Sequence, residues 1–238
     1  MPVTSADLVS RILYRDAMML VIDKPSGLAV HASGRDDDHL GKYLDLLAFG
    51  LPQPPELAHR LDRETSGCLV LGRHRQALKR LGGLFATRRV EKVYWAVVVG
   101  DPPAECGCID RPLAKIEANT RHWRMKIDPR GQSAITDWRL LGHSGRLSWL
   151  ECRPRTGRTH QLRVHLASIG CPIVGDGIYG RGTADLVDGR LHLHARAVAL
   201  PLYPKRPPVT AVAPVPIHMA ESLAACGCGE LTEDEKDQ

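Results

Sequence analysis

Long hydrophobic runs are missing from this sequence of 238 residues. Its unbroken apolar stretches, such as residues 18–22 and 95–99, fall far short of the roughly 20 residues that a transmembrane helix needs. The amino-terminal segment carries acids and an arginine where a signal peptide needs an uninterrupted apolar stretch. We therefore expect no membrane association and no export, with the cytoplasm as the compartment.

A regular, even-numbered set of cysteines is missing too, because the seven present are scattered. Two C-x-C pairs, Cys106/Cys108 and Cys226/Cys228, leave one residue between the thiols, whereas structural zinc sites usually leave two to four. A disulfide framework is disfavoured. Free thiols in a reducing compartment are favoured over a four-thiolate zinc site.

The composition itself is that of an ordinary globular protein, with 43% hydrophobic and 25% charged residues, which argues against disordered, collagen-like and coiled-coil chains. The formal net charge is +5, although the last nine residues hold five acids and one lysine, so the rest of the chain is strongly basic. Of the 32 cations, 24 are arginine, the side chain suited to bidentate phosphate contacts. This balance makes a nucleic-acid partner plausible; arginine codons favoured by a GC-rich genome are the alternative explanation.

No internal repeat or long linker divides the chain, so we expect one globular domain over residues 1–225 and an acidic, flexible tail over residues 226–238. Strands often follow strands without an intervening helix, which predicts an α+β fold. The expected strands are residues 19–23, 68–71, 93–99, 134–141, 147–152, 191–200 and 209–215, and the expected helices are residues 40–49, 76–85 and 159–169.

The first informative segment is AHRLDRETSG at residues 58–67. If it is extended, side-chain alternation puts Arg60 and Asp62 on one face while Leu61 points to the core. A guanidinium beside a carboxylate favours the ionised form, so Asp62 is suited to act as a nucleophile or base rather than as an acid. The alternative is a loop salt bridge followed by a turn.

The second segment is RPRTGRTHQLRVHL at residues 153–166. Its four arginines surround the expected start of a helix, where free backbone amides attract anions. Because Leu162 and Leu166 recur at helical spacing, Arg163 lies at the edge of a buried stripe and needs a carboxylate, for which Asp62 is a candidate. The alternative, a solvated basic helix, does not explain why glycine, threonines and a glutamine are interleaved with the arginines.

The third segment is an expected strand at residues 91–100, with Tyr94 near its start. This ring is either a stacking platform for a base or simply a part of the core. Further basic residues would follow a polyanion backbone: residues 59–90 contain eight Lys or Arg against two acids, and residues 121–130 contain four against one.

Taken together, these motifs resemble the RluA-type family of RNA pseudouridine synthases. The resemblance covers about residues 12–215 in family order, and the pairing of H-R-L-D-x-x-T-S-G with the later R-T-G-R-T-H-Q-L-R run is highly specific. Residues 21–28, 92–96 and 175–180 carry the further motifs V-I-D-K-P-S-G-L, K-V-Y-W-A and G-D-G-I-Y-G.

The resemblance implies a mixed, largely antiparallel central sheet with flanking helices and an RNA-binding cleft. It also implies an isomerase that converts specific uridines of ribosomal or transfer RNA to pseudouridine without a metal or cofactor. We infer no obligate protein partner. By the same resemblance, Asp62 is the catalytic residue, Arg60 fills the space left by the flipped nucleotide, Tyr94 packs against the target base, and Arg163 pairs with and orients Asp62.

Two alternatives belong to other functional classes. One is a catalytically silent RNA-binding protein on the same fold. The other is a metal-dependent hydrolase using His59, His160, His165 or the cysteines, although no ligand pattern such as H-E-x-x-H is present. Many family members carry an accessory RNA-binding domain before the catalytic one, but here the first motif begins by residue 12, so we expect target selection to reside in the catalytic body.

Overall fold

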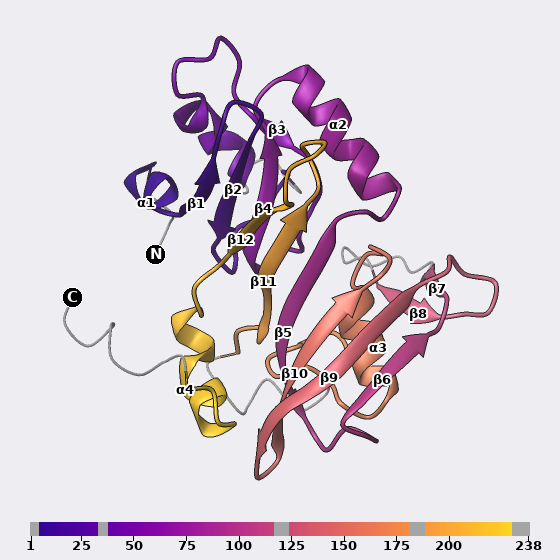
Figure 1. Ribbon diagram of the computed structural model, residues 1–238. Helices are drawn as coiled ribbons and strands as arrows, with labels where there is room; N and C mark the ends of the chain where they lie inside the picture. The colour runs from indigo at the N-terminus through magenta and orange to yellow at the C-terminus, as the bar shows by residue number, and fades with distance from the viewer. Residues whose placement is uncertain (1–4, 33–37, 117–123, 181–188, 230–238) are drawn as a thin grey trace. The chain divides into compact units, whose positions relative to one another are not determined.

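The computed structural model describes residues 5–32, 38–116, 124–180 and 189–229 (Figure 1). The chain divides into two compact units, each made of two stretches of sequence. The first unit comprises Met1–Lys92 and Ala195–Pro214, and the second comprises Val93–His194 and Val215–Gln238. Both units combine antiparallel strand pairs with helices, so the predicted α+β class is confirmed. The single catalytic domain over residues 1–225 stays a prediction.

In the first unit the strand order is β1-β2-β4-β11, with β3 beside β4 and β12 beside β11. Strands β2 and β4 pair antiparallel from Met19 opposite Gly72 to Lys24 opposite Gly67. All residues of both strands are buried, which explains why their sequences read as near-continuous apolar runs. The bounds are β1 Ile12–Arg15, β2 Met19–Lys24, β3 Glu56–Leu57, β4 Ser66–Gly72, β11 Leu193–Leu200 and β12 Val209–Val212.

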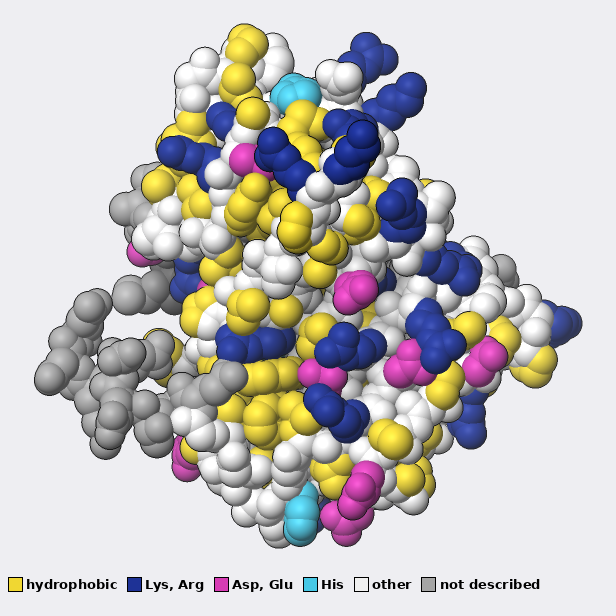
Figure 2. All heavy atoms as spheres, viewed as in Figure 1, with side chains coloured by type: hydrophobic (Ala, Val, Ile, Leu, Met, Phe, Trp, Pro, Cys, Tyr) yellow, Lys and Arg dark blue, Asp and Glu magenta, His cyan; other side chains and the backbone are white. Residues whose placement is uncertain are grey.

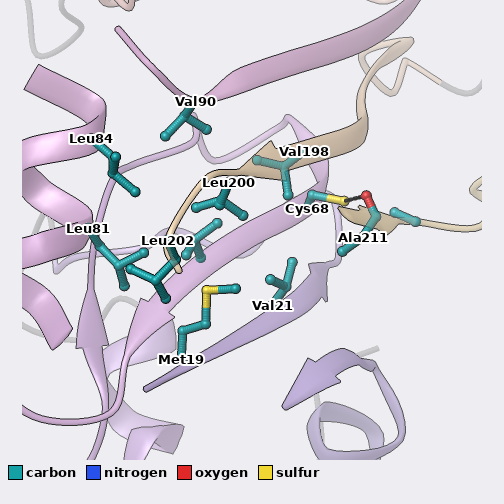
Figure 3. Close-up of a cluster of buried hydrophobic side chains, with 12 residues drawn as sticks. Met19, Val21, Cys68, Leu81, Leu84, Val90, Val198, Leu200, Leu202 and Ala211 are labelled. Atoms are coloured by element: carbon teal, nitrogen blue, oxygen red, sulfur yellow. Dashed lines mark hydrogen bonds between the residues drawn. The ribbon is translucent and has the colours of Figure 1, made fainter. Parts of the chain in front are cut away.

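The helices of the first unit are α1 (Ser5–Ser10), η1 (Leu40–Leu47) and α2 (Arg75–Ala86). The helix predicted over residues 40–49 is a 3-10 helix, which ends earlier. His74 is the N-cap of helix α2, and its Nδ1 accepts a hydrogen bond from the Ala77 amide. Figure 3 shows Leu81 and Leu84 of α2 pointing toward the buried side chains of β2, β4 and β11. Because α2 buries this apolar side against the strands, its opposite side is exposed to solvent.

In the second unit the strand order is β5-β10-β9-β6, and β7 and β8 form a separate antiparallel pair. The predicted hairpin is confirmed as β9 and β10, which pair from Leu147 opposite Ser144 to Pro154 opposite Thr136. The bounds are β5 Glu91–Val99, β6 Cys106–Asp110, β7 Leu113–Lys115, β8 Met125–Ile127, β9 Ile135–Ser144 and β10 Leu147–Pro154; the helices are α3 Gln161–Ser168 and α4 Ile217–Ala225.

Helices cover both faces of this second set of strands. Leu162 and Leu166 of α3 pack on one face, in a cluster with Ala96, Val98 and Leu150. On the other face, Met219 and Leu223 of α4 pack with Trp95, Val97 and Trp149. Residues 161–166 of α3 are all buried, because β7 and β8 add a small cluster around Val164. The prediction of a helix with one buried stripe therefore understated its burial.

The chain stays packed beyond the end of α4. Cys226 and Cys228, which fall within the segment predicted as a tail, are 4% and 5% exposed and join the cluster under α4. A Cβ on Gly142 of β9 would lie 1.9 Å from the Cys226 carbonyl oxygen, so only glycine permits this approach. The acidic residues 230–238 lie outside the described residues.

Candidate functional site

Asp62 lies in a segment without regular secondary structure between β3 and β4. Its carbonyl accepts a hydrogen bond from the Thr65 amide at 3.2 Å, which closes a turn. Leu61 is 5% exposed, whereas Arg60 is exposed and Asp62 half-buried. The burial of Leu61 is therefore confirmed, and the charged side chains on either side of it are more exposed; that Arg60 and Asp62 share one face stays a prediction.

A second loop, residues 25–28 after β2, fastens this segment. The Gly27 amide donates to the Arg63 carbonyl at 3.0 Å, and the Ser26 hydroxyl donates to the Glu64 carbonyl at 2.8 Å. Both bonds reach the backbone directly after Asp62, so the position of the carboxylate depends on the K-P-S-G motif.

Lys24 is the centre of this attachment. Its ammonium group is fully buried and donates to the carbonyls of Pro25, Leu28 and Arg63 at 2.8, 2.8 and 2.9 Å. Burial lowers the pKa of Lys24 to about 7, against the opposing negative charges of Glu64, Asp62 and Asp23. From the sequence, Lys24 stands out only as part of a family motif, because its partners are main-chain oxygens that no residue pattern reveals.

His59 fixes the beginning of the same segment. Its Nε2 accepts a hydrogen bond from the Val70 amide at 3.0 Å, and its ring stacks on Phe85 of α2 with centroids 4.5 Å apart. Burial, helped by the charge of Lys92, lowers the pKa of His59 to about 4. A neutral ring that accepts a backbone hydrogen bond anchors the segment to β4 and α2.

Arg163 lies in the second unit, on α3, and is 5% exposed. Its guanidinium donates from Nε and Nη2 to the two carboxylate oxygens of Asp176 at 2.8 and 2.7 Å. The amides of Ile178 and Tyr179 donate to the same carboxylate. Burial alone would raise the pKa of Asp176, but the bonds and charge of Arg163 hold it below its ordinary value.

Tyr179 extends this network. The Arg163 guanidinium lies over its ring, 5.3 Å from the centroid. The Tyr179 hydroxyl accepts from the Met125 amide at 2.8 Å and is 2.9 Å from Nδ1 of His160. Asp176 and Tyr179 belong to the G-D-G-I-Y-G motif, whose task the residue pattern alone did not indicate; it positions Arg163.

Gln161 and Thr156, which stand among the arginines of residues 153–163, hold the backbone in place. Gln161 Oε1 accepts from the Thr156 hydroxyl at 2.7 Å and from the Arg158 amide at 3.0 Å, while its Nε2 donates to Ile135 O and Thr136 Oγ1. These bonds fasten the start of α3 to β9, which explains why glutamine and threonine stand among the arginines.

The arginines of residues 153–163, predicted as a phosphate site, already have partners within the chain. Each donates to an acid or a carbonyl: Arg153 to Glu151, Arg155 to Asp137, Arg158 to Ser133 O, and Arg163 to Asp176. This run therefore offers less positive charge to a ligand than its sequence suggests.

Tyr94 lies on β5, opposite Cys152 of β10, and packs at the edge of the cluster under α3. Of the four predicted site residues, Arg60 and Asp62 thus belong to the first unit, and Tyr94 and Arg163 to the second. Their meeting around one uridine, including the pairing of Arg163 with Asp62, stays a prediction.

Among the described residues no group of three or more His, Cys, Asp or Glu side chains is placed to bind a metal ion. No helix within the same residues is long and apolar enough to span a membrane.

Known proteins are similar to this chain in sequence and in fold. Residues 18–168 match the family model for RNA pseudouridylate synthase. An uncharacterised RNA pseudouridine synthase of Zymomonas mobilis is 42% identical over 210 residues, covering 88% of this chain and 95% of that protein. The ribosomal large subunit pseudouridine synthase C of Vibrio cholerae is 36% identical over 225 residues, covering 92% and 70%.

The solved structure of human RNA pseudouridylate synthase domain containing 4 superimposes with a TM-score of 0.77 at 30% identity, covering 93% of this chain and 95% of that one.

Proposed function

Since the chain belongs to the RNA pseudouridylate synthase family, we propose that it isomerises specific uridines of ribosomal or transfer RNA in the cytoplasm, with Asp62 as the catalytic residue. The observation that supports the role of Asp62 is its place in H-R-L-D, on a turn fastened by Lys24, Ser26 and Gly27. Relatives named for the large ribosomal subunit support ribosomal RNA as the substrate.

In this reaction the bond between uracil N1 and ribose C1′ breaks, the freed uracil turns, and a bond forms between C5 and C1′. C5 loses its proton and N1 gains one, so the atoms balance without a co-reactant. Asp62 assists the cleavage by attack on the ribose or uracil or as a base. A paired uridine must first be flipped out of its stack, at a cost of a few kcal/mol.

Each of the other three residues has a separate task in this proposal. Arg60, exposed beside Asp62, occupies the space that the flipped nucleotide leaves. Tyr94 packs against the uracil ring, and Arg163, oriented by Asp176, pairs with the Asp62 carboxylate during the reaction.

The test is conversion of ribosomal and transfer RNA transcripts by purified protein, with nucleosides separated by chromatography. We expect Asp62→Asn to lower the rate of pseudouridine formation by at least about 10²- to 10⁴-fold, with RNA affinity unchanged. Asp45→Asn, the same change at an exposed position on η1, is the control and should keep full activity. Turnover by Asp62→Asn at the normal rate would refute the catalytic role; RNA binding without any product would indicate the catalytically silent alternative.

A further inference from the structure

The exposed side of α2 and the turn after it form a concentrated patch of positive charge. Residues 65–90 contain no Asp or Glu. Figure 2 shows Lys and Arg side chains gathered over α2 in the upper right of the view. The α2 basic face, as we name it, consists of the exposed side chains Arg75, Lys79, Arg80, Arg88 and Arg89.

Within the residues that the structure describes, these charges are not neutralised. Arg80 donates a hydrogen bond to the Leu202 carbonyl at 3.0 Å. Across the described part of the chain, none of the other four forms an ion pair. By contrast, Arg153 of β10 and Arg163 of α3 donate to acidic side chains. A cluster of like charges repels itself unless a polyanion binds to it.

Arg88 adds an independent observation. It follows α2 with a φ of 58°, in the left-handed region. The Arg89 amide donates to the Leu84 carbonyl at 2.9 Å, which makes the turn a Schellman motif whose left-handed position usually holds glycine. An arginine at a position that suits glycine supports a role for its side chain.

The α2 basic face is joined to the Asp62 segment inside the first unit. The Phe85 ring in the last turn of α2 stacks on His59, which directly precedes Arg60. Lys92 lies close by, and its pKa falls to about 8 through burial and then through the positive charge of Arg88. The field of the patch therefore extends toward the motif.

We propose that the α2 basic face binds the sugar-phosphate backbone of the substrate RNA outside the target nucleotide. This inference rests on the proposed function for the identity of the polyanion, and it assigns affinity, not chemistry, to these residues. Phosphates spaced along an RNA strand match a row of exposed cations along a helix, and each contact releases counterions.

The experiment measures binding of a fluorescein-labelled RNA hairpin by anisotropy between about 0.1 and 1 M KCl. The variant is K79Q/R88Q/R89Q, and the matched control is R139Q/R146Q/R153Q, which removes the same charge from exposed positions of the second unit. Both are made in the Asp62→Asn chain, so that turnover plays no part. Circular dichroism checks that each variant folds.

We expect K79Q/R88Q/R89Q to reduce the slope of log Kd against log salt by about 2, which weakens binding on the order of 100-fold at 0.1 M salt and hardly at all near 1 M. The slope of the control should differ from that of the parent by no more than about 0.5, because Arg139 and Arg153 already donate to Glu151. The charge-preserving variant K79R/R88K/R89K should bind as the parent does.

An unchanged slope in K79Q/R88Q/R89Q, or an equal loss in the control, would overturn the proposal. The proposal would also be overturned if K79Q/R88Q/R89Q lost binding to polyglutamate but kept its affinity for the RNA hairpin, since that result would identify an acidic protein as the partner. If the triple variant does not fold, Lys79→Gln and Arg89→Gln singly decide the question, each expected to lower the slope by about 0.7. Failure of the proposed function would be seen separately: the parent chain would form no pseudouridine, while the salt dependence of RNA binding would still differ between the variant and the control as described.

Discussion

The two units fix their motif residues by different means. In the first unit the Asp62 segment has no regular structure, and the buried ammonium of Lys24 donates to three main-chain carbonyls around it. In the second unit Arg163 lies in the first turn of α3, and the side chains of Asp176 and Gln161 hold the motif in place. A loop without regular structure needs donors from elsewhere in the chain for its carbonyls, whereas a helix satisfies most of its own backbone hydrogen bonds and leaves its side chains and its terminal backbone groups to be partnered.

The largest stability effect should come from the side-chain network. Asp176→Asn removes the carboxylate that accepts two bonds from a buried guanidinium, and we expect a loss of about 3–5 kcal/mol in the free energy of unfolding, measured by urea denaturation. Asp137→Asn is the control, because its partner Arg155 is exposed and the expected loss is about 1 kcal/mol or less. Equal losses in the two variants would erase the distinction between the buried and exposed pairs.

Next comes the backbone attachment. Lys24→Met keeps the length of the side chain but removes the donor to the carbonyls of Pro25, Leu28 and Arg63, of which, within the described part of the chain, only the Arg63 carbonyl keeps a second donor, the Gly27 amide. We therefore expect a loss of about 2–4 kcal/mol in the free energy of unfolding and a fall in pseudouridine formation. Lys42→Met, on the exposed surface of η1, should change neither measurement. If Lys24→Met unfolds at the urea concentration of the parent, the loop is fastened by Ser26 and Gly27 instead.

A smaller effect follows from the protonation of Lys24. Its pKa is about 7 in the folded chain and 10.5 as the ordinary value, so between these limits the unfolded chain binds more protons and stability rises with pH. From pH 7.5 to 8.5 we expect the parent to gain up to about 1.4 kcal/mol relative to Lys24→Met. Lys92 titrates in the same range but is present in both proteins and cancels in the difference. A difference that stays constant with pH would contradict the lowered pKa.

The smallest effect concerns α2. Gly83 is exposed within the helix, and a Cβ there would meet no described atom within 4 Å, so Gly83→Ala should stabilise the chain by about 0.5–1 kcal/mol in thermal or urea unfolding. The same substitution at Gly142 in the second unit should destabilise, because the Cys226 carbonyl stands in the way. If both variants changed the stability in the same direction, the result would argue against this packing of α4.

Most strands and the two main helices follow from apolar periodicity and turn residues, and the positions of Leu61 and Leu162 follow with them. The hydrogen-bond partners of Lys24 and Asp176 could not be predicted from such patterns. A lysine that donates to carbonyls has no complementary residue type to search for, and Asp176 stands 13 positions after Arg163 in a glycine-rich turn. The segment 153–163 looked like an anion site because its sequence does not show which acids neutralise it.

If the α2 basic face binds RNA as we propose, thermal stability and RNA affinity favour different residues at position 88. Glycine would relax the left-handed turn after α2, and it would also delete a charge from the α2 basic face. A laboratory selection for heat resistance alone should therefore enrich Arg88→Gly, while a selection for modification of dilute RNA at physiological salt should restore arginine. The residue found at position 88 would then show which of the two selections a population had passed through.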